Sequence, residues 1–228
     1  MKLTKTLFLT VVLGLFAVLQ SGASAGAASI AERFGPAAGG TQQGESGVYN
    51  FDRAHTFIGF KVKHMGLIEV PGFFRDFTGK ISYDAADVTR SSVEFAAKVT
   101  SIDTGVAGRD NHLRSKDFFE VETYPEMTFK STRVTKKGKN LMITGDLTLK
   151  GVTRSITFPF EIAGFVPGNE RSGMRMGVTA ETIINRRDYG VNYDSKLPNG
   201  TPSVDDSVKV VLAIEAVMPK AAAAPKSE

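Results

Sequence analysis

The chain has 228 residues, 42% of them hydrophobic and 23% charged, a composition typical of one globular domain with an ordinary core. It contains no cysteine, which excludes disulfides, thiolate nucleophiles and cysteine–metal sites. The formal net charge of +4 is too small a surplus to indicate a nucleic-acid partner.

The first 25 residues have the three parts of a secretory signal peptide. Lys2 and Lys5 give a positively charged start, residues 7–19 form an almost unbroken apolar run, and residues 23–25 (ASA) supply a small-x-small cleavage site. The apolar run is shorter than the roughly 18 residues that a membrane anchor needs. We therefore predict cleavage near Gly26 and an exported protein, periplasmic or secreted, with no stable membrane insertion.

The predicted folded domain covers residues 48–218. Residues 26–47 are rich in Ala, Gly, Gln and Ser and have little to bury, so we predict a flexible leader there. Residues 219–228 (PKAAAAPKSE) are predicted to be a similar flexible tail. No internal repeat or second domain boundary is visible between these segments.

Alternating apolar and polar residues indicate strands through most of this domain. The alternating stretches lie at residues 55–64, 77–83, 93–99, 127–131, 141–149, 156–162, 176–182 and 208–216. Hairpin turns are predicted at residues 136–139, where Gly138 permits a positive φ angle, and at Lys150–Gly151. About eight or nine antiparallel strands at this spacing predict an all-β sandwich or closed barrel.

The polar face of these strands indicates which way they point. Charges lie at mid-strand opposite the apolar residues, at Lys61, Lys63, Glu94, Lys98, Lys130, Lys209 and Glu215. On an outer-membrane barrel each of them would cost a few kcal/mol against lipid. We therefore predict an eight-stranded barrel with its apolar face inward and its charged face in water.

An eight-stranded barrel is just wide enough to be filled by side chains or to hold one small ligand. Small residues are predicted to face inward at Gly79, Ala97, Gly145 and Ala180, and Gly59 interrupts the first strand. They either relieve crowding between large neighbours or leave a slot for an apolar ligand. The sequence leaves both interpretations open.

Residues 109–129 (RDNHLRSKDFFEVETYPEMTF) break the alternation. We predict a short helix near Arg109–Phe119, capped by Asp110 or Asn111, with an apolar side that plugs or gates one end of the barrel. The Tyr124–Pro125 pair favours an extended start to the next strand, because the residue before proline is disfavoured in the helical region.

Four blocks of the sequence resemble signatures of the YceI-like family. They are residues 55–64 (HTFIGFKVKH), residues 109–119 with Tyr124–Pro125, residues 145–153 (GDLTLKGVT) and residues 187–190 (RDYG). They occur in order across the whole folded domain. The resemblance implies a periplasmic, lipocalin-like antiparallel barrel that holds a polyisoprenoid or similar long amphiphile, and it implies a homodimer.

Catalytic and metal chemistry finds little support in the residues. His55 and His64 are nine positions apart on an extended strand, too far to share a metal, and no spacing motif joins His112 to them. Nucleophile elbows, phosphate loops and dinucleotide fingerprints do not occur. The carboxylates near Asp117 lie beside Arg114 and Lys116, which favours local pairing over acid–base work. We predict no catalytic residue, no metal site and no cofactor other than a bound lipid or quinone.

The better functional hypothesis is capture of an apolar ligand, since burying a long chain supplies roughly 25 cal/mol per Å² without chemistry. Two pairs of cations, Arg109/Arg114 and Arg186/Arg187, either receive a polar head group or form salt bridges with Asp110, Asp117 or Asp188. The predicted ligand-binding residues are Ile58, Phe60, Val62, Phe77, Ile81, Phe95, Val99, Arg109, Leu113, Arg114, Phe118, Phe119, Met127, Phe129, Leu147, Phe158, Phe160, Met176, Arg186 and Leu212.

The predicted function is a carrier or store of a polyisoprenoid, an isoprenoid quinone or its precursor. Three alternatives remain at this point. One is a stress-related binder of fatty acids, amides or apolar toxins, the second is an enzyme acting on a quinone precursor, and the third is a filled barrel that acts only through protein partners.

Overall fold

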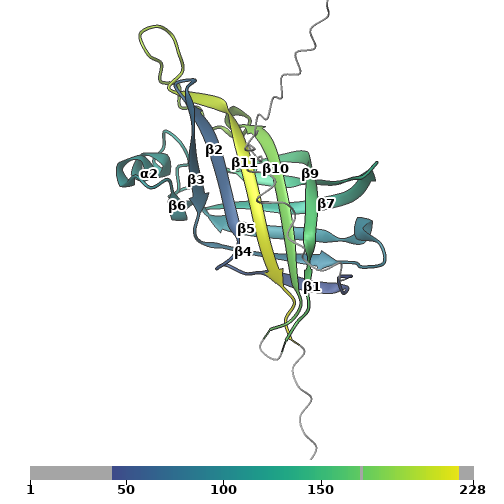
Figure 1. The fold of residues 1–228 in the computed structure, drawn as a ribbon. Helices are drawn as coiled ribbons and strands as arrows, with labels where there is room; N and C mark the ends of the chain where they lie inside the picture. Colours follow the sequence, from purple (N-terminus) through teal and green to yellow (C-terminus); the bar gives the residue numbers. More distant parts are fainter. Residues whose placement is uncertain (1–42, 170–171, 221–228) are drawn as a thin grey trace, which may run out of the picture. The chain divides into compact units, whose positions relative to one another are not determined.

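The computed structural model describes residues 43–169 and 172–220 (Figure 1). The predicted signal peptide, most of the predicted leader and most of the predicted tail lie outside the described residues. Within the described part, eleven strands pair antiparallel in one sheet. Their bounds are β1 Gly47–Phe51, β2 Phe57–His64, β3 Ile68–Phe74, β4 Phe77–Tyr83, β5 Ser92–Lys98, β6 Ile102–Asp103, β7 Glu126–Lys137, β8 Asn140–Leu149, β9 Val152–Val166, β10 Arg175–Asn185 and β11 Val204–Val217.

Eight of these strands form a closed ring, which confirms the predicted antiparallel eight-stranded barrel. The order is β1-β4-β5-β7-β8-β9-β10-β11, and the ring closes where β1 pairs with β11. Because β11 is long, its C-terminal end pairs with β1 while the rest of it pairs with β2. β2, β3 and β6 therefore extend the wall at one end, which we call the mouth.

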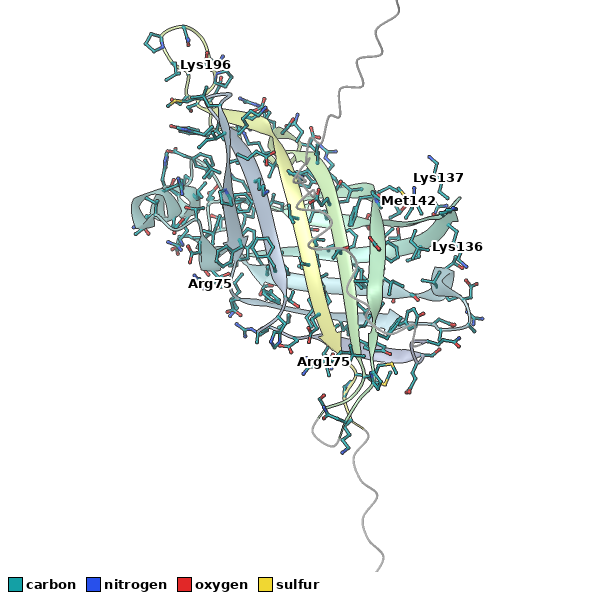
Figure 2. All side chains as sticks on the ribbon, viewed as in Figure 1. Arg75, Lys136, Lys137, Met142, Arg175 and Lys196 are labelled. Carbon is teal, nitrogen blue, oxygen red and sulfur yellow. The ribbon has the colours of Figure 1, made fainter. Side chains whose placement is uncertain are left out.

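The predicted turns form with the expected backbone chemistry. Lys150 and Gly151 both have positive φ angles, 48° and 72°, as a two-residue hairpin between β8 and β9 requires. Gly138 also has a positive φ, 62°. This turn is shorter than the predicted range 136–139. Lys136 and Lys137 still belong to β7, so only residues 138 and 139 lie between β7 and β8 (Figure 2).

Three of the strands were not predicted from the alternation. β1 and β6 are short, and in β3 Pro71 and Gly72 interrupt the alternation. Pro71 is tolerated because β6 pairs with β3 only at Phe73 and Phe74. The earlier residues of β3 are therefore a sheet edge on that side, where a missing backbone N–H costs no hydrogen bond between strands.

The predicted short helix is α2, Ala107–Arg114, and it is followed by hydrogen-bonded turns up to Tyr124. The predicted cap is wrong. Val106 occupies the N-cap position, and the Asp110 carboxylate lies inside the first turn, where it accepts the Thr104 backbone N–H at 2.9 Å. Asp110 thus ties the helix to the end of β6 instead of capping it. None of the helices in the described part of the chain is long and apolar enough to cross a membrane.

The end of the barrel opposite the mouth is filled by aromatic rings, and we call it the closed end. Tyr83 and Phe165 pack with ring centroids 5.0 Å apart, and Tyr49 lies 6.3 Å from each of them. The Tyr49 hydroxyl donates to the Glu45 carbonyl at 2.7 Å. Residues 43–46, expected to belong to a flexible leader, therefore contact this end.

Two of the inward small residues relieve crowding. A Cβ on Gly79 would lie 2.5 Å from the Phe51 ring, and one on Gly145 would lie 2.5 Å from the Phe129 ring. These glycines make room for aromatic side chains. These two positions therefore leave no slot for a ligand.

Candidate functional site

An apolar cavity of about 140 Å³ lies at the mouth. Residues from β2, β3, β5, β7, β8, β9, β10 and β11 form its wall, and Leu113, Phe118 and Phe119 cover it from the segment after β6. This segment therefore covers one end of the barrel, as the sequence analysis proposed. A second cavity of about 60 Å³ lies deeper, toward the closed end, and reaches Ile81, Tyr83 and Met176.

Four side chains line both cavities and separate them: Phe95, Phe129, Phe158 and Leu212. The rings of Phe95 and Phe129 stack with centroids 6.0 Å apart, and Phe129 lies 5.6 Å from Phe158. We call these four residues the partition. An apolar cavity of about 150 Å³ is enough for benzene, so a ligand with a long prenyl chain has to displace the partition.

Most of the predicted ligand-binding residues line the mouth cavity. They are Ile58, Phe60, Val62, Phe95, Leu113, Phe118, Phe119, Met127, Phe129, Leu147, Phe158, Arg186 and Leu212. Ile81, Phe160 and Met176 line the deeper cavity. Phe77 and Val99 are buried in the core but line neither cavity, and neither do Arg109 and Arg114.

The mouth cavity also has lining residues that were absent from the predicted set. Leu149, Ile156, Thr182, Val208 and Val210 stand on strand faces predicted to point inward, so the alternation contained the signal for them. Phe74, Val191 and Val204 were missed because β3, the loop before β11 and the first residues of β11 carry no clear alternation. Gly59 and Ile184 complete the lining.

Arg109 and Arg114 build the cover of the cavity. Arg114 donates from Nε to the Thr100 carbonyl at 2.8 Å and from Nη2 to the Ile102 carbonyl at 2.7 Å. Arg109 donates from Nη2 to the Thr104 carbonyl at 2.8 Å. Arg109 also donates to Thr104 Oγ1 and Arg114 to Asn111 Oδ1, at 2.7 and 3.0 Å. These neutral oxygens hold the segment in place, and among the described residues neither arginine forms the predicted alternative salt bridge to Asp110 or Asp117.

The cover is held from two further sides. The φ angles of Lys150 and Gly151 place the β8–β9 turn beneath it, so that Lys150 Nζ lies 3.9 Å from Glu120 Oε2. A Cβ on Gly151 would lie 2.6 Å from the Tyr124 ring, so this ring packs directly on the turn. On the other side His112 and Phe118 both pack against Tyr193, with ring centroids 5.2 and 4.6 Å away.

Arg186 is the one charged side chain among the lining residues, and it is 5% exposed. Its Nε donates to the Asp205 carbonyl, its Nη1 to the Val191 carbonyl and its Nη2 to Asp206 Oδ1, at 3.0, 2.7 and 2.6 Å. Burial lowers the pKa of the guanidinium, and the nearby Asp206 opposes that shift. With all three nitrogens engaged, Arg186 presents mainly its aliphatic stem to the cavity.

Arg187 shares the same carboxylate. Its Nε lies 2.7 Å from Asp206 Oδ1 and its Nη2 lies 2.9 Å from Asp194 Oδ1. Lys196 Nζ lies 3.7 Å from Asp194 Oδ2, and the charge of Asp205 also acts on Arg186. Three cations and three aspartates thus form a locally neutral cluster beside the mouth. Such a cluster has no net charge with which to attract a strongly anionic ligand.

One cluster at the closed end was not foreseen. Asp52, His55 and Glu215 bring potential metal ligands within 4.8 Å of one another. However, Arg175 Nη1 donates to Asp52 Oδ2 at 3.0 Å and also to Glu215, so both carboxylates already have a cation. The hydrogen bond with His55, followed by that with Arg175, lowers the pKa of Asp52 from 3.8 to about 2. This is an ion-pair network between β1, β10 and β11.

These features define a closed antiparallel barrel with an apolar cavity under a helical cover. The profile of the YceI-like domain matches residues 49–216. The chain therefore belongs to the YceI-like family.

Curated relatives agree with this assignment. The Protein YceI of Escherichia coli O157:H7 is 37% identical over 175 residues, covering 75% of this chain and 87% of its own length. A UPF0312 protein of Photorhabdus laumondii is 40% identical over 141 residues, covering 61% and 72%.

Solved structures have the same fold. The YCEI protein of Campylobacter jejuni is 30% identical, with a TM-score of 0.60, covering 74% of this chain and 96% of that one. A polyisoprenoid binding domain from Saccharophagus degradans, implicated in plant cell wall breakdown, is 17% identical, with a TM-score of 0.57 and coverages of 77% and 100%. The second likeness concerns the fold alone.

Proposed function

We propose that the protein is an exported carrier or store of a long apolar amphiphile, such as a polyisoprenoid, an isoprenoid quinone or its precursor. The observation that carries the proposal is the lining of the mouth cavity, which is apolar except for Thr182 and Arg186, in a barrel whose opposite end is filled. A ligand would gain roughly 25 cal/mol for each Å² of apolar surface that it buries there. The Saccharophagus polyisoprenoid binding domain, which has the same fold, supports this class of ligand.

The lining favours recognition of the ligand by its chain. Because the guanidinium of Arg186 is engaged by three protein oxygens, a polar head inside the cavity would lose its hydration without a free partner. The head group is therefore expected at the mouth, in water. A neutral head, such as a hydroxyl or a quinone, suits the neutral cluster around Asp206 better than a carboxylate does.

A long chain also requires a change inside the barrel. The cavities of about 140 and 60 Å³ together hold only a small part of such a ligand. Rotation of the partition side chains would join them into one tunnel between the mouth and the closed end. The broader binder of fatty acids or amides uses the same cavity, and this alternative differs in needing less movement of the partition.

Native extraction tests the proposal. The protein is purified from its own cells under mild conditions and denatured, and the released small molecules are identified by mass spectrometry. A stoichiometric prenyl lipid is the expected result. A fatty acid or amide in its place would favour the broader binder. No ligand, together with no rise in melting temperature on adding farnesol or solanesol (a short and a long prenyl alcohol), would leave a filled barrel and overturn the proposal.

A further inference from the structure

The tip of the β2–β3 hairpin exposes large apolar side chains at the mouth. Leu67 is 77% exposed and Ile68 is 65% exposed. The turn has the backbone conformation of a tight hairpin, since Met65 and Gly66 have positive φ angles and the Leu67 N–H donates to the His64 carbonyl at 2.9 Å. Figure 1 shows the hairpin projecting from the same end as the loop that precedes β11.

The exposed tip is continuous with the cavity lining. Ile68, Val70, Gly72 and Phe74 occupy alternate positions of β3 and therefore share one face of the sheet. Phe74 is buried and lines the mouth cavity, Val70 is half-buried opposite the lining residue Val62, and Ile68 is exposed. An apolar track thus runs from the cavity to the outermost point of the hairpin.

Positive charge lies beside this tip. Lys63 is exposed on β2. Lys196, which lies 3.7 Å from Asp194, is in the neighbouring loop, and this loop is joined to the hairpin where Met65 N–H donates to the Ser203 carbonyl at 3.1 Å. The acids near the tip face cations: Glu69 lies 3.9 Å from Lys61, Asp194 lies 2.9 Å from Arg187, and the charge of Asp205 acts on Arg186. Lys63 forms no ion pair among the described residues. The surroundings of the tip therefore favour an anionic surface.

We propose that the β2–β3 hairpin docks the mouth on an anionic phospholipid bilayer, so that a ligand passes between the bilayer and the cavity along the track of β3. The proposal rests on the proposed function, because a ligand with a long apolar chain resides in membranes and crosses water slowly. Two apolar side chains and a few cations give weak and reversible docking, which a carrier needs in order to leave the surface again. Lys196 and Arg175 lie at opposite ends of the barrel (Figure 2), so the closed end would face away from the membrane.

Flotation with lipid vesicles tests the docking. The Leu67→Ser/Ile68→Ser protein is expected to bind vesicles of phosphatidylcholine and phosphatidylglycerol at least about tenfold more weakly than the parent protein. Val166→Ser is the matched control, since Val166 is 55% exposed at the end of β9 that pairs with Arg175, on the closed side. Lys63→Gln is expected to weaken binding only when phosphatidylglycerol is present. Each sample needs its N-terminus determined, because retained residues 7–19 would bind membranes by themselves.

Two ligand measurements separate this proposal from the proposed function. Transfer of solanesol out of vesicles is expected to slow about tenfold in the Leu67→Ser/Ile68→Ser protein, while its affinity for farnesol added in solution stays that of the parent. A parent protein that floats with vesicles but binds neither alcohol would refute the proposed function and leave the docking intact. Unchanged flotation of the double variant would refute the docking. The docking would also be refuted if the double variant lost dimers but still floated with vesicles, because the tip would then be a contact between two copies of this chain.

Discussion

The two ends of the barrel are built from similar residues but in opposite ways. At the closed end, Tyr49, Tyr83 and Phe165 fill the interior, and the ion-pair network around Arg175 joins the strands outside it. At the mouth, the strands extend beyond the ring, the interior holds a cavity, and a helical segment covers it. An aromatic-rich interior therefore does not by itself specify a filled barrel. The arrangement of rings along the axis decides where space remains.

The largest effect is expected from emptying the closed end. Phe165→Ala removes a buried ring from between Tyr49 and Tyr83 and should lower the free energy of unfolding by about 3–5 kcal/mol, measured by urea denaturation. Farnesol affinity should stay the same. Phe119→Ala, in the half-buried cover, should cost less stability and change farnesol affinity instead. Equal stability losses in the two variants would remove the distinction between the ends.

A smaller effect is expected from the ion-pair network. The pKa of Asp52 is about 2 in the folded protein and 3.8 without these contacts, so its carboxylate stabilises the fold above pH 3.8, and the contribution disappears as the pH falls through about 2. Asp52→Asn should therefore cost about 2 kcal/mol at neutral pH and almost nothing near pH 2. Asp146→Asn, an exposed carboxylate on β8 without an ion pair among the described residues, is the control for mutation alone. A gap between Asp52→Asn and the parent that stays constant with pH would contradict this account.

The smallest change in stability is expected from the partition. Phe158→Leu should cost about 1 kcal/mol and increase the preference for solanesol over farnesol several-fold, because a smaller side chain opens the passage between the cavities. Phe77→Leu is the matched control, since Phe77 is equally buried but lines neither cavity. Competition between the two alcohols measures the preference. The same shift in both variants would mean that the partition does not select for chain length.

The sequence predicted the barrel and its inward face because alternation in a strand maps directly onto the two faces of a sheet. It failed where local chemistry breaks that alternation. Pro71 and Gly72 concealed β3, which is tolerated only because part of it is a sheet edge. Asp110 resembled a helix cap but bonds to Thr104, since its partner was decided by the packing of α2 on the end of β6.

The candidate site, like the fold, has features that local sequence patterns predict and features that they do not. Local patterns predicted an apolar lining, the hairpin turns and a segment that covers the mouth, because periodicity, glycine positions and the break in alternation can all be read along the chain. The fold was needed to show that the arginines bond to backbone carbonyls, that Phe77 and Val99 lie away from both cavities, and that four side chains divide the interior in two. These features depend on which residues meet across the barrel, and contacts between distant segments leave no periodic mark in the chain.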